Sequence, residues 1–585
     1  MISYENNMKH LFTSKCTVFC LLSLLGSGLS SAAKERAEAT GNPIVIASKF
    51  YHVDEQHHLI LINKSKADVA INAAAATSSI ILDKEYEFVE ENLQINTANS
   101  YAVEYEKTLY TVYFTNLPIV HIDTRHAIVD TPSVYATFKM SETNGTVTTS
   151  NLGVEVRGGS SQANPKKSYE LSFWADTLGD SSRDVKLLGM RTDNKWNLQA
   201  LYNEPLRTNS KVANELWQEM SQLYYKAKEP DAKNGIAMSY VELFVNDEYK
   251  GLYSLTERID RKQLKLKKYT TSIKGELYKG SDWYGAVTFT SLPEFSNTSL
   301  TWGGFEYKHP EEYTDWTNLY DFVKFVETSS DAEFMQQYQS KFNLKNAVDY
   351  YIFLNVLRAT DNTGKNLYIA KYNVGEPYFY VPWDLDGVFG NNWMGQNDNT
   401  TNDILTNGFY KRLNQDCSAT GFRSVLMRRW AELRTTVLTA DHIMAKFTDN
   451  NAYLQANSVY QREQAVWTSF NYDDKQLPYV ASWLTKRLAY LDKTFSQPCT
   501  LLSSTTSKQG PAVQFYPNPA SDYLVVEALA STYEVCIQDV SGRVALKTTA
   551  HTPASRLDIS QLPKGLYLVL VKGENFVATE KLVRN

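Results

Sequence analysis

One segment near the middle of the chain constrains the fold more than any other, because four local patterns follow one another without a break. Apolar residues at helical spacing over about 344–357 predict an amphipathic helix. A polar loop at 361–366 follows, and apolar runs at 367–370 and 378–381 predict two short strands. An acidic turn at 384–386 closes the series. This order predicts a mixed α+β domain with its chemistry on the loop and the turn.

The loop and the acidic turn carry side chains suited to phosphoryl transfer. Asp361 and Asn366 are five residues apart, so the carboxylate can take a hydroxyl proton while the amide oxygen binds a metal ion. Asp384 is the favoured carboxylate for a metal that bridges phosphates, and Asp386 is its competitor or a second ligand. Lys365 is a further candidate for nucleotide binding. The spacing alone is a weak signal, since Asp and Asn often cap turns, but the surrounding elements give it weight.

A glycine-containing turn upstream predicts a phosphate-binding site. A strand-like run at 154–156 leads into the sequence Arg157-Gly158-Gly159-Ser160-Ser161. Small residues let backbone N–H groups approach phosphate oxygens closely. Arg157 and Ser160 are therefore candidates for binding a nucleotide.

The next expected strand, about 165–173, begins with two neighbouring lysines. Alternation places Lys167 on the apolar face of this strand and Lys166 on the wetter face. We therefore expect Lys167 to bind the nucleotide phosphates, with a solvated pair of lysines at the start of a strand as the alternative. A helix is expected over about 206–220, but its acidic residues lie off its apolar stripe. The ion-pair partner of Lys167 therefore stays open.

A β-hairpin is expected between about residues 241 and 256, with Asn246 and Asp247 in its turn. The segment that begins at Glu257 then leaves the sheet toward the helical half of the domain. In a two-lobed kinase, adenine meets the connecting strand at this point, so Glu257 is a candidate for nucleotide binding. A surface salt bridge is the alternative for this residue.

Length and charge narrow the range of functions. The chain has 585 residues, too many for one hydrophobic core, so several domains are expected. The formal net charge is -6, which differs from the basic surface of a protein that binds nucleic acid.

Cys417 and Cys499 flank a predicted helical region and could pair or could both be free. Cys536 is expected to be a buried thiol in a strand.

The N-terminus has the parts of an export signal. Basic residues at 9–15, an apolar run at 17–29 and small residues at 30–33 predict a signal peptide over residues 1–33. The apolar run is too short for a permanent anchor, and no other segment has 18 or more continuous apolar residues. We therefore expect no transmembrane anchor.

Changes in composition divide the rest of the chain. We predict a small β module at 43–110, the α+β domain at 113–500, a Ser/Thr-rich linker at 501–511 and a β-sandwich at 512–585. The role of the β module stays open.

The C-terminal part carries several turn motifs in a fixed order. They are Tyr516-Pro517-Asn518-Pro519, Asp539-Val540-Ser541-Gly542-Arg543 and Gly565-Leu566-Tyr567. This part resembles the type IX (Por) secretion sorting domain of Bacteroidota, with an ordinary β-sandwich binding module as the alternative. The resemblance implies handling by the type IX secretion machinery. It also implies a secreted or cell-surface protein that passes through the periplasm.

Motifs over about residues 113–495 resemble the CotH kinase family. They are Arg157 to Ser161, Pro165 to Tyr169, Leu187-Leu188-Gly189, Pro205-Leu206-Arg207, Tyr249 to Tyr253 with Glu257, Leu277-Tyr278-Lys279, Asp361 to Tyr368, and Trp383 to Asp386 with Phe389-Gly390. The resemblance implies a two-lobed, atypical protein-kinase-like fold that binds ATP with Mg or another divalent cation. It also implies phosphorylation of Ser or Thr in exported proteins, including the chain itself.

By this resemblance, Asp361 would be the catalytic residue and Asp384 would bind the metal. Two other functions stay open. A catalytically inactive surface adhesin or scaffold could use the same fold. A glycosidase could use Asp361 and Asp384 as its acid and base.

Overall fold

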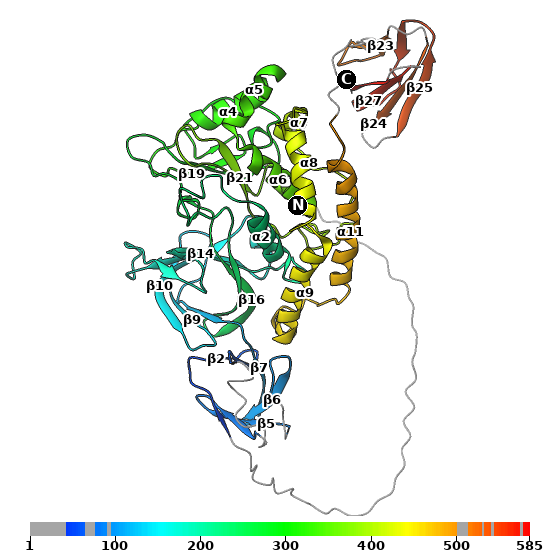
Figure 1. Cartoon of the computed structure of the whole chain (residues 1–585). Coiled ribbons are helices and arrows are strands. Elements are labelled where there is room, and N and C mark those ends of the chain that lie inside the picture. The colour runs from blue at the N-terminus through cyan, green and yellow to red at the C-terminus, as the bar shows by residue number, and fades with distance from the viewer. Residues whose placement is uncertain are drawn as a thin grey trace, which may run out of the picture. The chain divides into compact units, whose positions relative to one another are not determined.

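The computed structural model describes residues 43–64, 77–90, 95–499, 513–528, 532–539, 543–573 and 577–585 (Figure 1). The expected signal peptide at 1–33 and the linker at 501–511 lie outside the described residues. The chain divides into two compact units, Met1–Pro498 and Cys499–Asn585. Helices and strands are both abundant, which confirms the expected α+β class.

A seven-stranded sheet forms the first part of the larger unit. Its strands are β1 (Ile44–Val45), β2 (Tyr51–Asp54), β3 (Leu59–Ile62), β4 (Ser79–Ile81), β5 (Glu85–Phe88), β6 (Ser100–Tyr105) and β7 (Thr108–Phe114), in the spatial order β1-β4-β5-β6-β7-β3-β2. Buried apolar side chains such as Ile60, Tyr86 and Val112 form its core. Because β7 continues to Phe114, the sheet extends past the end expected at residue 110.

A closed barrel follows, in the order β10-β11-β14-β16-β15-β8-β9. Its strands are β8 (Ile119–Asp123), β9 (Val134–Ser141), β10 (Val147–Arg157), β11 (Ser168–Trp174), β14 (Lys195–Gln199), β15 (Met238–Val245) and β16 (Glu248–Thr256). Apolar side chains, among them Phe138, Leu171 and Trp196, fill its core. The expected hairpin is β15–β16, and Asn246 and Asp247 in its turn have φ of 51° and 63°. Asn and Asp tolerate this left-handed region, which a tight hairpin turn requires.

A five-stranded sheet in the order β18-β19-β17-β20-β21 lies later in the same unit. Its strands are β17 (Glu276–Gly280), β18 (Thr301–Trp302), β19 (Phe305–His309), β20 (Leu367–Lys371) and β21 (Tyr378–Pro382). Helix α6 (Leu344–Leu357) contacts β21 and has the bounds predicted from the apolar spacing. Every residue from Asn346 to Leu357 is buried, so α6 is a core helix and not the amphipathic helix that was expected.

The other elements of the larger unit are mainly helical. They are α2 (Asn209–Met220), α3 (Arg261–Leu264), α4 (Thr317–Thr328), α5 (Asp331–Lys341), α7 (Gly408–Leu413), α8 (Phe422–Arg434), α9 (Ala440–Ala456), α10 (Val459–Val466), α11 (Gln476–Phe495), the 3-10 turns η1 (Ser160–Ala163), η2 (Ala286–Thr288) and η3 (Thr360–Thr363), and the strands β12 (Val185–Lys186) and β13 (Thr192–Asp193). Helix α2 starts later than expected because Arg207 has a left-handed φ of 58°. No helix in the described parts of the chain is long and apolar enough to cross a membrane.

The smaller unit is built from two sheets. One contains β22 (Gln514–Tyr516), β23 (Tyr523–Glu527) and β26 (Ala554–Asp558), and the other contains β24 (Tyr533–Asp539), β25 (Val544–Ala550), β27 (Gly565–Lys572) and β28 (Val577–Arg584). Val526 of the first sheet and Val535 and Val569 of the second belong to one buried core. The unit is therefore a β-sandwich, the architecture predicted for this part.

The three cysteines outside the expected signal peptide differ in state. Cys417 and Cys499 are both disulfide-bonded, so the alternative of two free thiols does not hold. Cys536 lies in β24 as a free, partly buried thiol.

A buried ion pair connects the helical part of the larger unit with the barrel. Arg462 of α10 donates to Glu242 of β15, and both side chains are fully buried. The hydroxyl of Tyr249 in β16 donates a hydrogen bond to the other oxygen of Glu242 at 2.5 Å. Arg462 also donates a hydrogen bond to the carbonyl of Asn457 at 2.6 Å. Both charges are thus compensated inside the protein, where an unpaired charge is strongly unfavourable.

Replacing Arg462 with methionine should lower the free energy of unfolding by about 3–5 kcal/mol, because Glu242 would stay buried without its cation. Urea unfolding followed by tryptophan fluorescence reports on the larger unit alone, since all 11 tryptophans precede residue 499. The matched control is Arg428→Met on the exposed side of α8, which should change stability by less than about 0.5 kcal/mol. Equal effects of the two substitutions would contradict this account.

Candidate functional site

A cleft of about 1410 Å³ is lined by residues of both the barrel and the five-stranded sheet. Seven of the nine residues predicted to form the site line it: Arg157, Ser160, Asp361, Lys365, Asn366, Asp384 and Asp386. The other two, Lys167 and Glu257, do not line it. The predicted loop and acidic turn thus share one cavity with the glycine-containing turn, from which they are separated by about two hundred residues.

Asp361 lies on a 3-10 turn directly after the core helix. Helix α6 ends because Arg358 has a φ of 51°, and the Arg358 guanidinium is held by Asp398 at 2.5 Å and Asp403 at 2.9 Å. The turn η3 follows and brings Asp361 to the cleft. The indole Nε1 of Trp283 donates to Asp361 Oδ1 at 3.3 Å. The backbone before Asp361 and one oxygen of the Asp361 carboxylate are therefore both held in place.

Asn366 and Asp384 flank the open end of the β20–β21 hairpin. Their φ values are 56° and 54°, in the left-handed region that Asn and Asp adopt more readily than most residues. The N–H of Trp383 donates to the carbonyl of Asn366 at 3.0 Å. Buried Asn362 donates to the carbonyls of Asn366 and Trp383 at 2.6 and 2.7 Å. These bonds hold the metal-candidate residues of the loop and the turn beside each other.

Several carboxylates gather at this end of the cleft. Burial raises the pKa of Asp386 well above its usual range, and the charge of Asp384 and then that of Glu204 add to the effect. Burial also raises the pKa of Glu204 to about 7, although Ser210 donates to this carboxylate through its N–H and its hydroxyl. The Oε2 atom of Glu204 is buried without a hydrogen-bond partner among the residues that the structure describes. The negative charge here is thus only partly compensated by the protein.

This donor set fits a divalent cation of the Mg²⁺ type. Mg²⁺ prefers oxygen ligands, and Asn366, Asp384 and Asp386 offer an amide oxygen and carboxylates at one end of the cleft. Asp384 is exposed and forms no salt bridge within the described part of the chain. Burial, and after it the charge of Asp384, raises the pKa of Asp386, and a bound cation would offset both effects.

Two cations lie on the walls of the same cleft. The guanidinium of Arg157 lies 5.4 Å from the centre of the Trp383 ring, and the ammonium of Lys365 lies 3.9 Å from the centre of the Trp283 ring. Burial lowers the pKa of Arg157, and the charge of Asp384 opposes this shift. Stacking on aromatic rings orients both cations and leaves their N–H groups for anionic ligands.

The glycine-containing turn has the conformation that its sequence suggests. Gly158 has a φ of 119°, and a Cβ atom at this position would lie 2.1 Å from the hydroxyl oxygen of Ser161. A larger residue is therefore excluded on both conformational and steric grounds. The turn continues into η1, which places Ser160 at the cleft.

The structure does not place Lys167 at the cleft. Its ammonium donates to the carbonyls of Gln162 and Asn164 at 2.5 and 2.7 Å, and it does not line the cleft, whereas Lys166 does. The apolar face of β11 points into the filled barrel, so ligands meet the more polar face, which carries Ser168. The sequence argument identified the two faces correctly but assigned the site to the wrong one.

Lys166 has an ion-pair partner that the sequence did not reveal. Its ammonium donates to Glu463 of α10 at 2.7 Å and to the carbonyl of Leu252 at 2.6 Å, and all these groups are buried. Arg207 donates to the second oxygen of Glu463 at 3.1 Å. Burial, with the charge of Arg207 opposing Glu463, lowers the pKa of Lys166 to about 8. The two partners are 297 residues apart, so no local pattern links them.

Glu257 does not line the cleft either, because its carboxylate is fully buried and bonded within the protein. It accepts hydrogen bonds from Lys233 at 2.6 Å, from Gln263 at 2.8 Å, and from the N–H groups of Arg191 and Ala237 at 2.9 and 3.0 Å. These bonds lower its pKa against the opposing effect of burial. Glu257 therefore ties together the segments around the end of β16, and it is not a surface residue either.

Comparison with protein families gives two matches. A family model described as CotH kinase protein matches residues 154–491, and one described as secretion system C-terminal sorting domain matches residues 514–585. No curated protein matches the chain. The first match includes the cleft residues from Arg157 to Asp386 and also Glu463. The second agrees with the predicted sorting domain, and it indicates handling by the type IX secretion machinery and a secreted or cell-surface location.

The buried carboxyl of Glu204 should make stability depend on pH. The unfolded chain loses this proton near pH 4.5 while the folded chain keeps it to about pH 7. Stability is therefore lost as the pH rises through this window, by about 3 kcal/mol relative to a Glu204→Gln variant. Urea unfolding between pH 4.5 and 8, in EDTA and followed by tryptophan fluorescence, measures the difference.

The matched control for Glu204 is Glu312→Gln, which removes a carboxyl from the exposed rim of the same cleft. Its stability should follow that of the parent protein at every pH. If the Glu204→Gln curve also runs parallel to the parent curve, the protonated state of Glu204 near neutral pH is refuted.

Proposed function

Since the chain belongs to the CotH kinase family, we propose that it is an exported kinase that uses ATP and Mg²⁺ to phosphorylate Ser or Thr of exported proteins, itself included. The observation that carries the proposal is the convergence of Asp361, Asn366 and Asp384 on one cleft. Their order along the chain and their roles follow the needs of phosphoryl transfer to a hydroxyl group.

In this proposal the chain has two lobes, one on each side of the cleft. The barrel, with Arg157 and Ser160, forms the nucleotide side, and the five-stranded sheet with α6 forms the side that carries Asp361. Arg157 and Lys365 bind phosphate oxygens, since both are cations at the cleft whose N–H groups are oriented by aromatic rings. Lys166 replaces Lys167 as the lysine of the nucleotide side, and Glu463 sets its position.

Asp361 is the proposed general base. Its carboxylate accepts the proton of a Ser or Thr hydroxyl while that oxygen bonds to the γ-phosphorus and ADP departs. The indole of Trp283 restricts the orientation of the carboxylate through its hydrogen bond at 3.3 Å. Asn366 and Asp384, with Asp386, would hold Mg²⁺, which supplies positive charge to the phosphates when bound. Catalysis would then consist of positioning and electrostatic stabilisation.

Asp361→Asn and Asp384→Asn should separate the two roles. Asparagine keeps the left-handed backbone at residue 384, so the second variant removes a charge without straining the turn. Asp384→Asn should lose the Mg²⁺-dependent part of ATP binding in calorimetric titration. Asp361→Asn should still bind ATP with Mg²⁺ but transfer phosphate about 10²–10⁴-fold more slowly, measured with radiolabelled ATP and the chain as its own acceptor.

Asp321→Asn, on the exposed face of α4, is the matched control and should behave like the parent chain in both assays. ATP binding that needs no metal and persists in Asp384→Asn would refute the metal assignment. A chain that binds no nucleotide with any divalent cation would instead support an inactive adhesin or scaffold. Hydrolysis of a glycoside that depends on Asp361 and Asp384 would support the glycosidase reading.

A further inference from the structure

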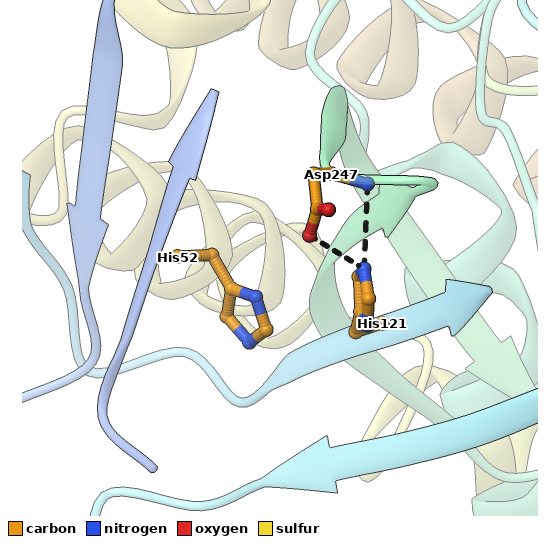
Figure 2. Close-up of side chains that lie close together, drawn as sticks. All are labelled: His52, His121 and Asp247. Carbon is orange, nitrogen blue, oxygen red and sulfur yellow. Dashed lines mark hydrogen bonds and ion pairs between the residues drawn. The ribbon is translucent and has the colours of Figure 1, made fainter. Parts of the chain in front are cut away.

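A second group of polar side chains lies at the contact between the N-terminal sheet and the barrel (Figure 2). His52 is in β2, His121 is in β8 and Asp247 is in the turn between β15 and β16. One ligand atom of each lies within 4.8 Å of those of the other two. None of the three lines the cleft, so the group is independent of the proposed kinase site.

His52 is buried, and one nitrogen of its ring is left without a hydrogen bond from the described residues. Its side chain is 9% exposed, and its Nε2 atom has no hydrogen-bond partner among the described residues. The ring lies 5.0 Å from Phe244 in a stacked arrangement and 5.0 Å from His121 in a tilted one. Burying an imidazole without a hydrogen bond is unfavourable, so the position calls for a ligand.

His121 and Asp247 already have the separation of two ligands on one metal ion. Figure 2 shows the His121 ring facing the Asp247 side chain and backbone: Nε2 lies 3.1 Å from Asp247 Oδ1 and accepts a hydrogen bond from the Asp247 N–H at 3.3 Å, a bond that a metal ion on Nε2 would replace. Two ligands at about 2.0–2.1 Å from a tetrahedral Zn²⁺ are about 3.3 Å apart. The Asp247 side chain is 78% exposed, so it can adjust its position over the rings.

The surroundings hold the three segments in place. The N–H of Tyr249 in β16 donates to Asp54 of β2 at 2.8 Å, which fixes β2 beside the hairpin that carries Asp247. Lys139 of β9 pairs across from His121, and its charge opposes a cation here. The carboxylates of Asp247 and Asp123 offset that charge. The charges around the site therefore offset one another and do not repel a divalent cation.

We propose that His52, His121 and Asp247 bind one transition-metal dication, with Zn²⁺ as the best match, and that water completes a tetrahedral coordination. Two imidazoles and one carboxylate are a donor set that suits Zn²⁺, whereas the oxygen donors of the cleft suit Mg²⁺. The ion links β2 of the N-terminal sheet to the barrel. This gives the N-terminal sheet a defined, metal-dependent attachment to the rest of the larger unit.

The test uses the full secreted chain without a polyhistidine tag, freed of metal with EDTA and then titrated with Zn²⁺ in competition with a chromogenic chelator. We expect one Zn²⁺ per chain. His121→Gln and Asp247→Asn should each weaken binding at least about 10-fold, the loss that follows removal of even an outer partner of a metal ligand. Asn at residue 247 keeps the turn intact, because it tolerates the left-handed φ of 63°.

Two controls remove similar groups outside the proposed site. His58→Gln removes an exposed histidine near β2, and Asp384→Asn removes a carboxylate from the cleft. Both should bind Zn²⁺ as the parent does, and Co²⁺ in its place should give the visible absorption of a four-coordinate ion. No stoichiometric Zn²⁺ binding, equal binding in the two test variants and the parent, or loss in Asp384→Asn alone would overturn the proposal.

Discussion

The buried carboxylate of Glu463 is the interaction on which the geometry of the cleft depends. It accepts hydrogen bonds from Lys166 in the segment before β11, from Arg207 in the loop before α2, and from the N–H of Leu252 in β16 at 2.6 Å. Gly251 makes this approach possible, because a Cβ atom there would lie 2.0 Å from a Glu463 oxygen. Since buried charges are tolerated only when paired, the barrel, the loop and α10 hold one another in position. A lysine that lines the cleft is thereby fixed from outside the barrel.

Arg157 and Asp384 line the cleft without the direct pairing that stabilises buried ions elsewhere in the larger unit. Elsewhere in the larger unit, buried ions such as Arg462 and Glu242 compensate each other directly. In the cleft, Arg157 stacks on Trp383, and neither Arg157 nor Asp384 forms a salt bridge within the described residues. A ligand that carries both signs of charge, such as a metal-bound polyphosphate, would compensate the charges of Arg157 and Asp384 at once. The same arrangement explains why burial and neighbouring carboxylates raise the pKa of Asp386.

Local patterns in the sequence predicted the elements that carry the chemistry, because periodicity and turn residues report on nearby backbone. The helix at 344–357, the strands after it and the β15–β16 turn all follow from such signals. The errors concern what lies far away in sequence. Whether the apolar face of β11 meets a ligand or a filled barrel cannot be read from the strand itself, and this misassigned Lys167.

The same limit explains the residues that were missed. Glu463 meets Lys166 across 297 residues, and Glu204 is distinguished only by its burial. His52, His121 and Asp247 come from three separate segments, none of which has the spacing of a metal motif. Contacts of this kind depend on tertiary packing, which single-sequence patterns do not encode.

The left-handed backbone at Asn366 and Asp384 limits which residues can replace them. These positions select for Asn, Asp or Gly on conformational grounds alone, before any metal is considered. A lineage that no longer needed the metal could replace Asp384 by asparagine or glycine without strain, whereas alanine or a larger side chain would strain the hairpin. Glycine at both positions, in an otherwise intact domain, would leave no side chain there to bind a metal and would therefore indicate a descendant that had kept the fold and lost the reaction.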